Sequence, residues 1–403
     1  MPNKSQNESF DKKNLTIFMV TNNYHPYSGG VVTTIDSYAQ ELRMQGHKVI
    51  IVTLDFLGDK QIIDDVVRIE SPVRFKYCNN YMAIPWRPTK SLYDLAQKHK
   101  PDIIHAFHPF LLGPCALQVG RQLNIPVVFT YMTLYDQYLH YVPFPQTITK
   151  PITNYLVNDF CHKVNNLIVP SYSTKKYIEE NGITRSMSKV SLSILPEFLK
   201  ETFALKEKTP GEPFVVLFVS RFTPEKNVPF LLDTFKLLDQ SKYKFVLIGY
   251  GSQTQELKDY AYNKLGLSAN AVVFYIKPEK SVIRDWYDKA DLFLFASKTD
   301  TQGLVLAEAM ARGTPVIALK ASGVVDIVQN GINGFMVDNA IEMAQKINIV
   351  CDNNSLHQTM QYHAWTTGNA YSAKNCTQSL LEVYYQTIAH SKGAPNSNAV
   401  NVN

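Results

Sequence analysis

The sequence predicts an α/β protein with two Rossmann-like domains, each a doubly wound parallel sheet, and three observations support this class. Short apolar runs rich in β-branched residues alternate with segments whose apolar residues recur every three or four positions, as in a parallel sheet and its helices. The alternation occurs twice, before and after a polar stretch at residues 205–213. The chain has 403 residues, more than the roughly 100–200 of a usual domain.

The first set begins with predicted strands at residues 15–20 and 48–54, and the helix between them follows Gly29-Gly30. It continues as strand, helix and strand at residues 102–107, 111–123 and 126–130. A strand–helix–strand unit of this length pairs its strands in parallel.

The second set has the same order of elements. Its predicted strands are residues 213–220, 243–249, 271–275, 291–296 and 314–318, and its predicted helices are residues 228–238, 252–265, 281–289 and 303–312. The two sets predict a first domain over residues 1–205 and a second over 206–368. We expect a C-terminal helix over 369–391 to pack on the first domain and a disordered tail over 392–403.

Composition argues against several classes of protein. The 40 Lys and Arg against 35 Asp and Glu give a net charge of +5, too even a balance for a dedicated nucleic-acid binder. No run approaches the roughly 18 apolar residues of a membrane span, and the polar N-terminus lacks the apolar segment of a signal peptide. Five scattered cysteines without a CxxC pair indicate reduced thiols in a cytosolic protein and no metal site.

Ligands of open parallel sheets bind at the carboxyl ends of the strands, so the cleft between two such sheets is the expected site. Gly29 and Gly30 precede a helix, where backbone N–H groups can approach an anion. The GxGxxG fingerprint of nicotinamide dehydrogenases is absent there. His105 lies within an apolar strand and is predicted to be a core histidine, whereas His108 follows the strand and is predicted to face the cleft.

Two further strand ends carry charged residues. Arg221 follows a buried strand and Lys226 stands near the next helix, a cation pair that suits a diphosphate. Asp300 lies in a loop and Glu308 in the following helix, so the two carboxylates can hold different hydroxyl groups of one ligand. The first N–H groups of that helix are predicted to face a phosphate: those of Gly303, Leu304 and Val305. A nucleotide diphosphate sugar is the ligand that needs all of these groups.

On these residues the sequence resembles the retaining glycosyltransferases of family 4, which have the two-domain GT-B fold. The stretch from Asp300 to Glu308 is similar to the family's Glu-x7-Glu motif. The resemblance implies that Asp300 contacts the donor sugar and Glu308 the ribose. It implies that Arg221 and Lys226 hold the diphosphate, with no metal or other cofactor. Three more positions match family residues near the donor: Gly30, His108 and Gly251.

Residues 129–144 are similar to the TYHTxYxxYxHY segment of bacterial diacylglycerol glucosyltransferases. This similarity implies UDP-glucose as the donor, a membrane lipid as the acceptor, and acceptor contacts from Tyr131, Tyr135 and Tyr138. Met132 stands where that segment has His, and Asp300 is one methylene shorter than the usual Glu. Residues 195–201 replace a PxGxD-like turn of the family, a change for which we have no physical explanation.

Positive charge is concentrated between residues 66 and 100, which hold seven Lys and Arg but only two acidic residues. Aromatic residues are interleaved with these cations, a mixture that suits an anionic membrane interface. We therefore expect this stretch to dock the protein on the inner face of the cytoplasmic membrane through Arg74, Lys76, Trp86 and Arg87. The alternative is a solvated surface loop and helix.

The sequence leaves several functions open. The first is a hexosyltransferase that acts on a lipid, and the second is a soluble glycosyltransferase with a sugar, small-molecule or protein acceptor. A nucleotide-sugar epimerase or hydrolase and an inactive sugar-nucleotide-binding protein are the others. The sequence does not predict the oligomeric state.

Overall fold

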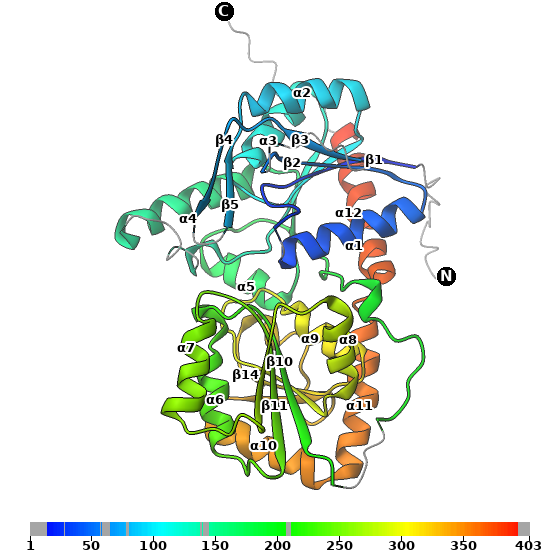
Figure 1. Ribbon diagram of the computed structural model, residues 1–403. Coiled ribbons are helices and arrows are strands. Elements are labelled where there is room, and N and C mark those ends of the chain that lie inside the picture. Colours follow the sequence, from blue (N-terminus) through cyan, green and yellow to red (C-terminus); the bar gives the residue numbers. More distant parts are fainter. Residues whose placement is uncertain are drawn as a thin grey trace, which may run out of the picture.

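The computed structural model describes residues 14–27, 29–56, 58, 65–77, 80–137, 139, 145–206 and 211–393 (Figure 1). Tyr138 and the end of the predicted tail, residues 394–403, lie outside these described residues. Two parallel sheets, each covered by helices, lie one above the other, so the predicted α/β class with two doubly wound domains is confirmed. In this described part of the chain, no helix is long and apolar enough to cross a membrane.

The first sheet has seven parallel strands in the order β3-β2-β1-β6-β7-β8-β9. They are β1 (Thr16–Val20), β2 (Lys48–Leu54), β3 (Val66–Ile69), β6 (Ile103–Ala106), β7 (Val127–Thr130), β8 (Asn166–Val169) and β9 (Met187–Lys189). Because successive side chains of a strand point to opposite faces, Ile17 joins the core beside α1 (Gly30–Met44). Phe18 joins the core beside α2 (Pro88–His99), α3 (Leu112–Leu123) and α4 (Gln146–Lys163). Burial of both faces explains the continuous apolar runs.

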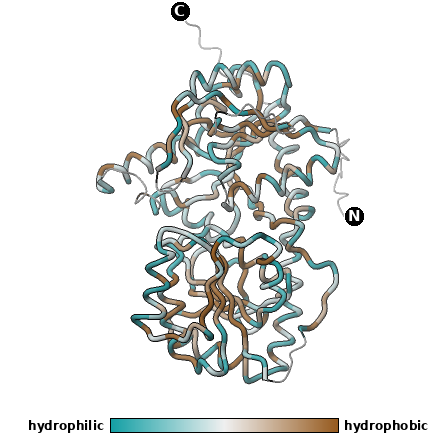
Figure 2. Tube along the Cα trace, viewed as in Figure 1, coloured by the Kyte–Doolittle hydropathy of each residue, from teal (hydrophilic) through white to brown (hydrophobic). Residues whose placement is uncertain are grey.

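The second sheet has six parallel strands in the order β12-β11-β10-β13-β14-β15. They are β10 (Phe214–Val219), β11 (Tyr243–Gly249), β12 (Val272–Ile276), β13 (Leu292–Phe295), β14 (Val316–Leu319) and β15 (Gly334–Val337). Its helices are α6 (Val228–Lys236), α7 (Thr254–Asp259), α8 (Lys280–Lys289), α9 (Leu304–Ala311), α10 (Ala340–Asp352) and α11 (Asn354–Asn369). Figure 2 shows these strands as a hydrophobic centre between more polar helices. The helix predicted at 252–265 is α7 followed by a π turn, and β15 was not predicted because its four residues follow a turn-like Asn/Gly stretch.

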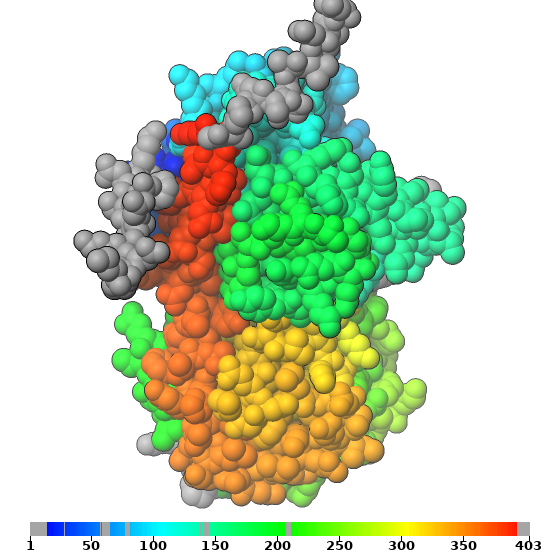
Figure 3. Space-filling view, turned by 180° about the vertical axis from the view of Figure 1, so that it is seen from behind, coloured from blue at the N-terminus to red at the C-terminus, as the bar shows by residue number. Residues whose placement is uncertain are grey.

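The last helix, α12 (Ala373–Gly393), crosses from the second domain to the first, and Figure 3 shows it (orange to red) along the side of both. Its Tyr384 lies in the first domain's core, with its hydroxyl 2.6 Å from Nδ1 of His105. Nε2 of His105 lies 2.6 Å from Oγ1 of Thr130. His105 is fully buried with both ring nitrogens bonded, as predicted for a core histidine, and burial lowers its pKa to about 3.

A hairpin stands inside the basic stretch. Strands β4 (Val73–Tyr77) and β5 (Asn80–Ile84) pair antiparallel, and the outward face carries Val73, Phe75, Met82 and Ile84, which are 42–54% exposed. Arg74 stands opposite the buried Ala83 on the inward face, with Nη2 at 2.5 Å from Oδ2 of Asp55. This ion pair holds Arg74 against the domain, and the expected contact of Arg74 with a membrane stays a prediction.

Candidate active site

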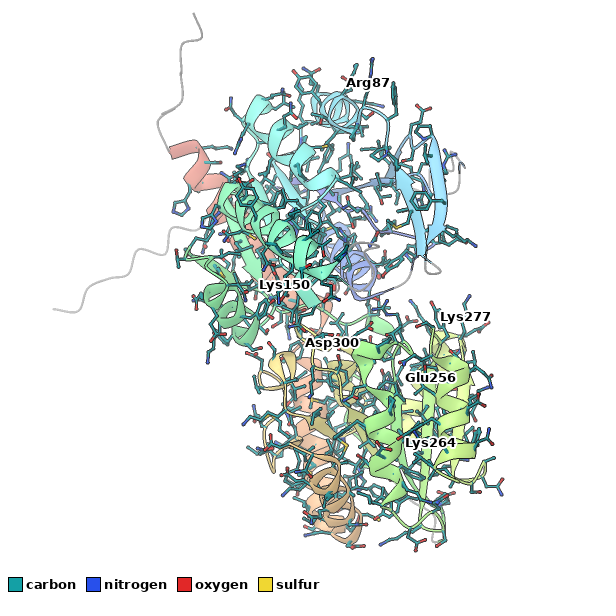
Figure 4. All side chains as sticks on the ribbon, turned by 90° about the vertical axis from the view of Figure 1, so that its left-hand side faces the viewer. Arg87, Lys150, Glu256, Lys264, Lys277 and Asp300 are labelled. Atoms are coloured by element: carbon teal, nitrogen blue, oxygen red, sulfur yellow. The ribbon has the colours of Figure 1, made fainter. Side chains whose placement is uncertain are left out.

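The predicted residues lie at the two points where strand order reverses. In the first sheet β1 lies between β2, the next strand along the chain, and β6, from which the order continues in the other direction. In the second sheet β10 lies between β11 and β13 in the same way. The loops that leave these four strands carry Gly30, His108, Lys226 and Asp300. Figure 4 shows Asp300 at the edge of the second domain that faces the first. Such reversal points are where doubly wound sheets bind ligands.

Lys226 and Asp300 form the most closely joined pair at the site. Nζ of Lys226 donates to both carboxylate oxygens of Asp300, at 2.8 Å each. Burial alone would raise the pKa of Asp300, but Lys226, together with a hydrogen bond from Ser297 and the charge of Arg221, outweighs it and holds this pKa below its usual value. Asp300 is therefore ionised at neutral pH, and it holds the Lys226 ammonium at the ends of β10 and β13.

Arg221 is held by a second carboxylate, which the sequence did not single out. Its Nη2 lies 3.2 Å from Oε1 of Glu225, and the same oxygen accepts a 2.7 Å hydrogen bond from Oγ1 of Thr223. Glu225 is buried, whereas about a third of the Arg221 side chain is exposed. The guanidinium is thus anchored by Glu225 and remains partly exposed to solvent.

Gly251 supports this loop through close backbone packing. A Cβ on Gly251 would lie 2.2 Å from the carbonyl oxygen of Phe222, a distance that no side chain tolerates. The N–H of Phe222 donates to the carbonyl of Tyr250, and the Gly251 N–H donates to Oγ1 of Thr254. Gly251 therefore positions the residues next to Arg221, and its predicted contact with a nucleotide stays a prediction.

Glu308 is buried in α9, with Oε2 accepting a 2.9 Å hydrogen bond from the hydroxyl of Tyr287 in α8. Burial raises the pKa of Glu308 to about 7, although the Tyr287 hydrogen bond acts in the opposite direction. Both protonation states are accessible near neutral pH. Tyr287 is fully buried, and its helical spacing in the sequence was that of an ordinary core residue, so nothing there marked it as a partner of Glu308.

Two helix N-termini meet between the domains. α9 begins after Gly303, whose φ of +71° lies in the left-handed region that favours glycine. α1 begins at Gly30, after Gly29, and neither helix has a side-chain cap. A Cβ on Gly30 would lie 3.7 Å from Cδ1 of Leu304, so the two helix starts are neighbours. Their first N–H groups, including those of Leu304 and Val305, lie where the sequence predicts an anion site, and the contact with a phosphate stays a prediction.

His108 faces this region from the loop after β6. Its Nδ1 accepts a 3.2 Å hydrogen bond from the N–H of Asn22, which places the proton of the neutral ring on Nε2. Burial lowers the pKa of His108 to about 4, so the ring is uncharged at neutral pH. His108 is therefore a neutral hydrogen-bond donor, and nothing in the sequence indicated Asn22 as its partner.

The predicted acceptor residues follow β7 and lie beside the site, since the carbonyl of Met132 accepts a 3.1 Å hydrogen bond from Oγ1 of Thr301. Tyr131 is 5% exposed, and its ring packs edge-on against those of Phe129 and Tyr135. The ring of Tyr131 is thus part of the core in this structure, and its contact with an acceptor stays a prediction. Tyr135 also packs edge-on against Phe110, in the loop that follows His108.

The predicted membrane residues are outside the site. Figure 4 places Arg87 at the end of the first domain that is remote from Asp300. Arg87 lies 5.7 Å from the ring of Trp86, which is 61% exposed, and Nζ of Lys76 lies 4.7 Å from the ring of Tyr81.

Polar residues that the sequence did not single out join the two domains beside Asp300. The carbonyl of Thr301 accepts from the hydroxyls of Ser171 and Thr174, at 2.7 and 2.9 Å. The carboxylate of Asp326 accepts from the N–H groups of Tyr172 and Ser173, the first residues of α5 (Tyr172–Glu180). These residues looked like ordinary loop positions in the sequence because their partners lie more than a hundred residues away.

A metal would need a cluster of ligands. Among the residues that the structure describes, no group of three or more His, Cys, Asp or Glu side chains is placed to hold a metal ion.

Comparison with known proteins adds to this geometry. Residues 200–366 match the family model described as glycosyl transferases group 1, and residues 28–191 match that of glycosyltransferase family 4. The chain is 32% identical over 324 residues to the alpha-monoglucosyldiacylglycerol synthase of Streptococcus pneumoniae, covering 75% of this chain and 71% of that protein. It is 26% identical to the protein of the same name from Acholeplasma laidlawii, covering 89% and 95%.

Solved structures share the fold. The HepE protein of Anabaena in complex with UDP-glucose aligns with a TM-score of 0.71 at 18% identity, covering 93% of this chain and all of that one. Sucrose-phosphate synthase from Thermosynechococcus elongatus aligns with a TM-score of 0.74 at 17% identity, over the same shares. At these identities the likeness concerns the fold.

Proposed function

The chain belongs to the family 4 glycosyltransferases with the GT-B fold, and on this premise we propose that it transfers glucose from UDP-glucose to a diacylglycerol-type lipid at a membrane surface, with retention of anomeric configuration. The observation that carries the proposal is the arrangement at the second sheet's reversal point. There the Lys226–Asp300 pair and the partly exposed guanidinium of Arg221 lie in the loops beside the start of α9. The names of the two monoglucosyldiacylglycerol synthases support the lipid acceptor.

In this proposal the second domain holds the donor. Arg221 and Lys226 stabilise the charge that develops on the diphosphate as its bond to the anomeric carbon breaks, an electrostatic effect commonly worth about 3–4 kcal/mol. Glu308 accepts hydrogen bonds from ribose hydroxyls, and Asp300 contacts the sugar. The helix N-termini at Gly30 and Gly303 add N–H donors to the diphosphate.

The first domain supplies the acceptor side. The acceptor hydroxyl oxygen forms the new bond to the anomeric carbon on the face that the diphosphate leaves, and its proton passes to a leaving phosphate oxygen. The Nε2–H of His108 donates a hydrogen bond to the sugar. No metal takes part in these steps, because the two cations and the helix N-termini carry the neutralisation.

The hairpin of β4 and β5, with Trp86 after it, is the proposed membrane contact, on the cytoplasmic side. Its outward residues are apolar, and Lys76 and Arg87 lie beside them. Apolar and aromatic groups flanked by cations suit an anionic interface, where each cation contributes about 1 kcal/mol.

The test is to incubate the protein with UDP-glucose and liposomes that contain diacylglycerol, and to measure glycolipid and released UDP. Release of UDP that depends on lipid, with an α-linked product, supports the proposal. Release without any acceptor would instead indicate a hydrolase or epimerase, and transfer to soluble sugars alone a soluble glycosyltransferase. Binding without turnover would indicate an inactive protein.

Docking is tested separately by liposome sedimentation. Binding that rises with the fraction of phosphatidylglycerol and falls with salt is expected, and Phe75→Ser with Trp86→Ser should weaken it. Binding that is indifferent to both lipid charge and salt would contradict the hairpin's assignment.

A further inference from the structure

A groove of about 590 Å³ runs between α3 and α4 on the outer face of the first domain. The part nearest the cleft is apolar and is lined by Pro109, Phe110, Leu111, Pro114, Leu156 and Phe160. Pockets of roughly 300–1,000 Å³ with apolar walls are the usual seats of small molecules. This groove is separate from the charged groups proposed to hold the donor.

The groove is continuous with the site through one loop. That loop carries His108, and the next three residues, Pro109 to Leu111, line the groove. Asn22 holds both parts together: its backbone N–H donates to His108, its side chain donates to the carbonyl of Phe110 at 2.9 Å, and its Oδ1 accepts from the N–H of Leu112 at 3.1 Å. The groove therefore begins at the residue that follows His108, and a molecule bound in it has one end next to this loop.

An exposed apolar stripe continues from the groove along α4. Ile148, Ile152, Tyr155 and Leu156 recur at helical spacing and are 44–70% exposed, and Leu156 also lines the groove. The buried residues of α4, which are Val157, Phe160 and Cys161, belong to its second half. Figure 1 accordingly shows the first half projecting from the domain. Contiguous apolar surface of this kind marks an interaction site.

We propose that the groove and this stripe form the seat of an acyl chain of the lipid acceptor, and that the chain enters along α4 and brings its glycerol hydroxyl to His108. The inference rests on the proposed function, and it adds a second lipid contact besides that of the hairpin. The long apolar path without a charged residue at its cleft end suits a hydrocarbon chain. Arg121 lines the far end of the groove and supplies a basic group where bilayer phosphates would lie, whereas Lys163 in the same lining is ion-paired with Asp159 at 2.5 Å.

Acyl-chain dependence tests the proposal. Leu156→Asp is compared with Ile349→Asp, a matched control in α10, because the two parent side chains are 44% and 45% exposed. Transfer is measured to dioleoylglycerol and to dibutyrylglycerol in mixed micelles. For Leu156→Asp we expect kcat/KM to fall about tenfold with dioleoylglycerol, the loss of one buried apolar side chain. The value with dibutyrylglycerol and the Kd for UDP-glucose should change less than twofold, and Ile349→Asp should change nothing.

An equal loss with both acceptors, or no loss with either, would overturn the seat while leaving the proposed function intact. If the unmodified protein glucosylates no diacylglycerol at all, the proposed function fails. A binding measurement then decides whether the groove holds an acyl chain. Diacylglycerol with a diazirine near the end of one acyl chain is photolysed with the protein on vesicles of phosphatidylcholine and phosphatidylglycerol. Label within residues 109–122 and 148–163 supports the seat, whereas label confined to residues 73–86, or a dimer that Leu156→Asp dissociates, contradicts it.

Discussion

The two sides of the cleft are built by different means. On the second domain's side the two cations are paired with carboxylates: Lys226 with Asp300, and Arg221 with Glu225. On the first domain's side the central group is the uncharged His108, held by the backbone N–H of Asn22 beside an apolar groove. A diphosphate needs fixed charges that cost no reorganisation when it binds, whereas a neutral lipid hydroxyl needs positioning. The contrast supports the proposal that the second domain holds the donor and the first domain the acceptor.

The largest effect is expected from Lys226→Met. This change removes the ammonium that balances Asp300 and that is proposed to stabilise the leaving diphosphate, so kcat should fall by about 10²–10³. The matched control is Lys242→Met, whose lysine is ion-paired at the surface with Asp352 at 2.6 Å. Steady-state glucosyl transfer measures both variants. A Lys226→Met enzyme within tenfold of the unmodified one would show that the charged side does not act on the leaving group.

His108→Ala tests the neutral side. Loss of one positioned hydrogen-bond donor should reduce kcat by about tenfold to 10²-fold, while the Kd for UDP-glucose stays within about threefold because the charged side is intact. Calorimetric titration and turnover separate the two quantities, and His162→Ala, an exposed histidine of α4, is the control. A large loss of donor affinity with unchanged kcat would contradict this prediction, because it would mean that His108 acts in donor binding.

The same contrast explains how far the sequence leads. Strands such as β1 and β10 were predictable because both of their faces are buried and the apolar run is continuous. His108, Lys226 and Asp300 were predictable because the carboxyl ends of parallel strands converge on one edge. The hairpin was missed because its apolar residues face outward on one side only, in a stretch dominated by cations.

The hydrogen-bond and ion-pair partners of the site residues could not be predicted from the sequence. Three residues act through contacts that depend on tertiary structure. Glu225 holds Arg221, and Tyr287 contacts Glu308 from another helix. Asn22, after β1, donates to His108, which follows the neighbouring strand β6. Each is of a residue type that is common in loops or cores, and no spacing rule links it to its partner. The sequence thus identified the groups that can contact a ligand better than the groups that orient them.

A pH dependence follows from Glu308 and sharpens the description of the charged side. Its pKa of about 7 means that the carboxylate is mostly protonated at pH 6 and mostly ionised at pH 8. Because the ionised form accepts hydrogen bonds from ribose hydroxyls better, the affinity for UDP-glucose should rise about tenfold between pH 6 and pH 8. Glu308→Gln keeps an acceptor for Tyr287 but cannot ionise. Titrations that show the same pH dependence in Glu308→Gln would assign it to another group.

The same raised pKa has a consequence for stability with a definite sign. The folded protein holds the Glu308 proton more tightly than the unfolded chain does, so ionisation destabilises the fold as pH rises from about 4.5 through 7. Glu308→Gln should therefore have a higher Tm than the unmodified protein at pH 8, and the difference should shrink toward pH 5. Thermal unfolding in the absence of UDP-glucose measures this, and a difference of the opposite sign would contradict the buried carboxylate.

The smallest effect is expected where the two sides are joined. Asp326→Ala removes the carboxylate that binds the first N–H groups of α5 across the boundary, and loss of a helix cap costs about 1 kcal/mol. Asn339→Ala is matched to it, because Asn339 caps α10 within the second domain. Both variants should lose a similar few degrees in Tm. Only Asp326→Ala should raise the release of UDP without acceptor, by a fewfold, because a looser boundary admits water to the donor. Equal hydrolysis in both variants would mean that the joint beside Asp300 contributes stability alone and does not hold the charged and neutral sides together.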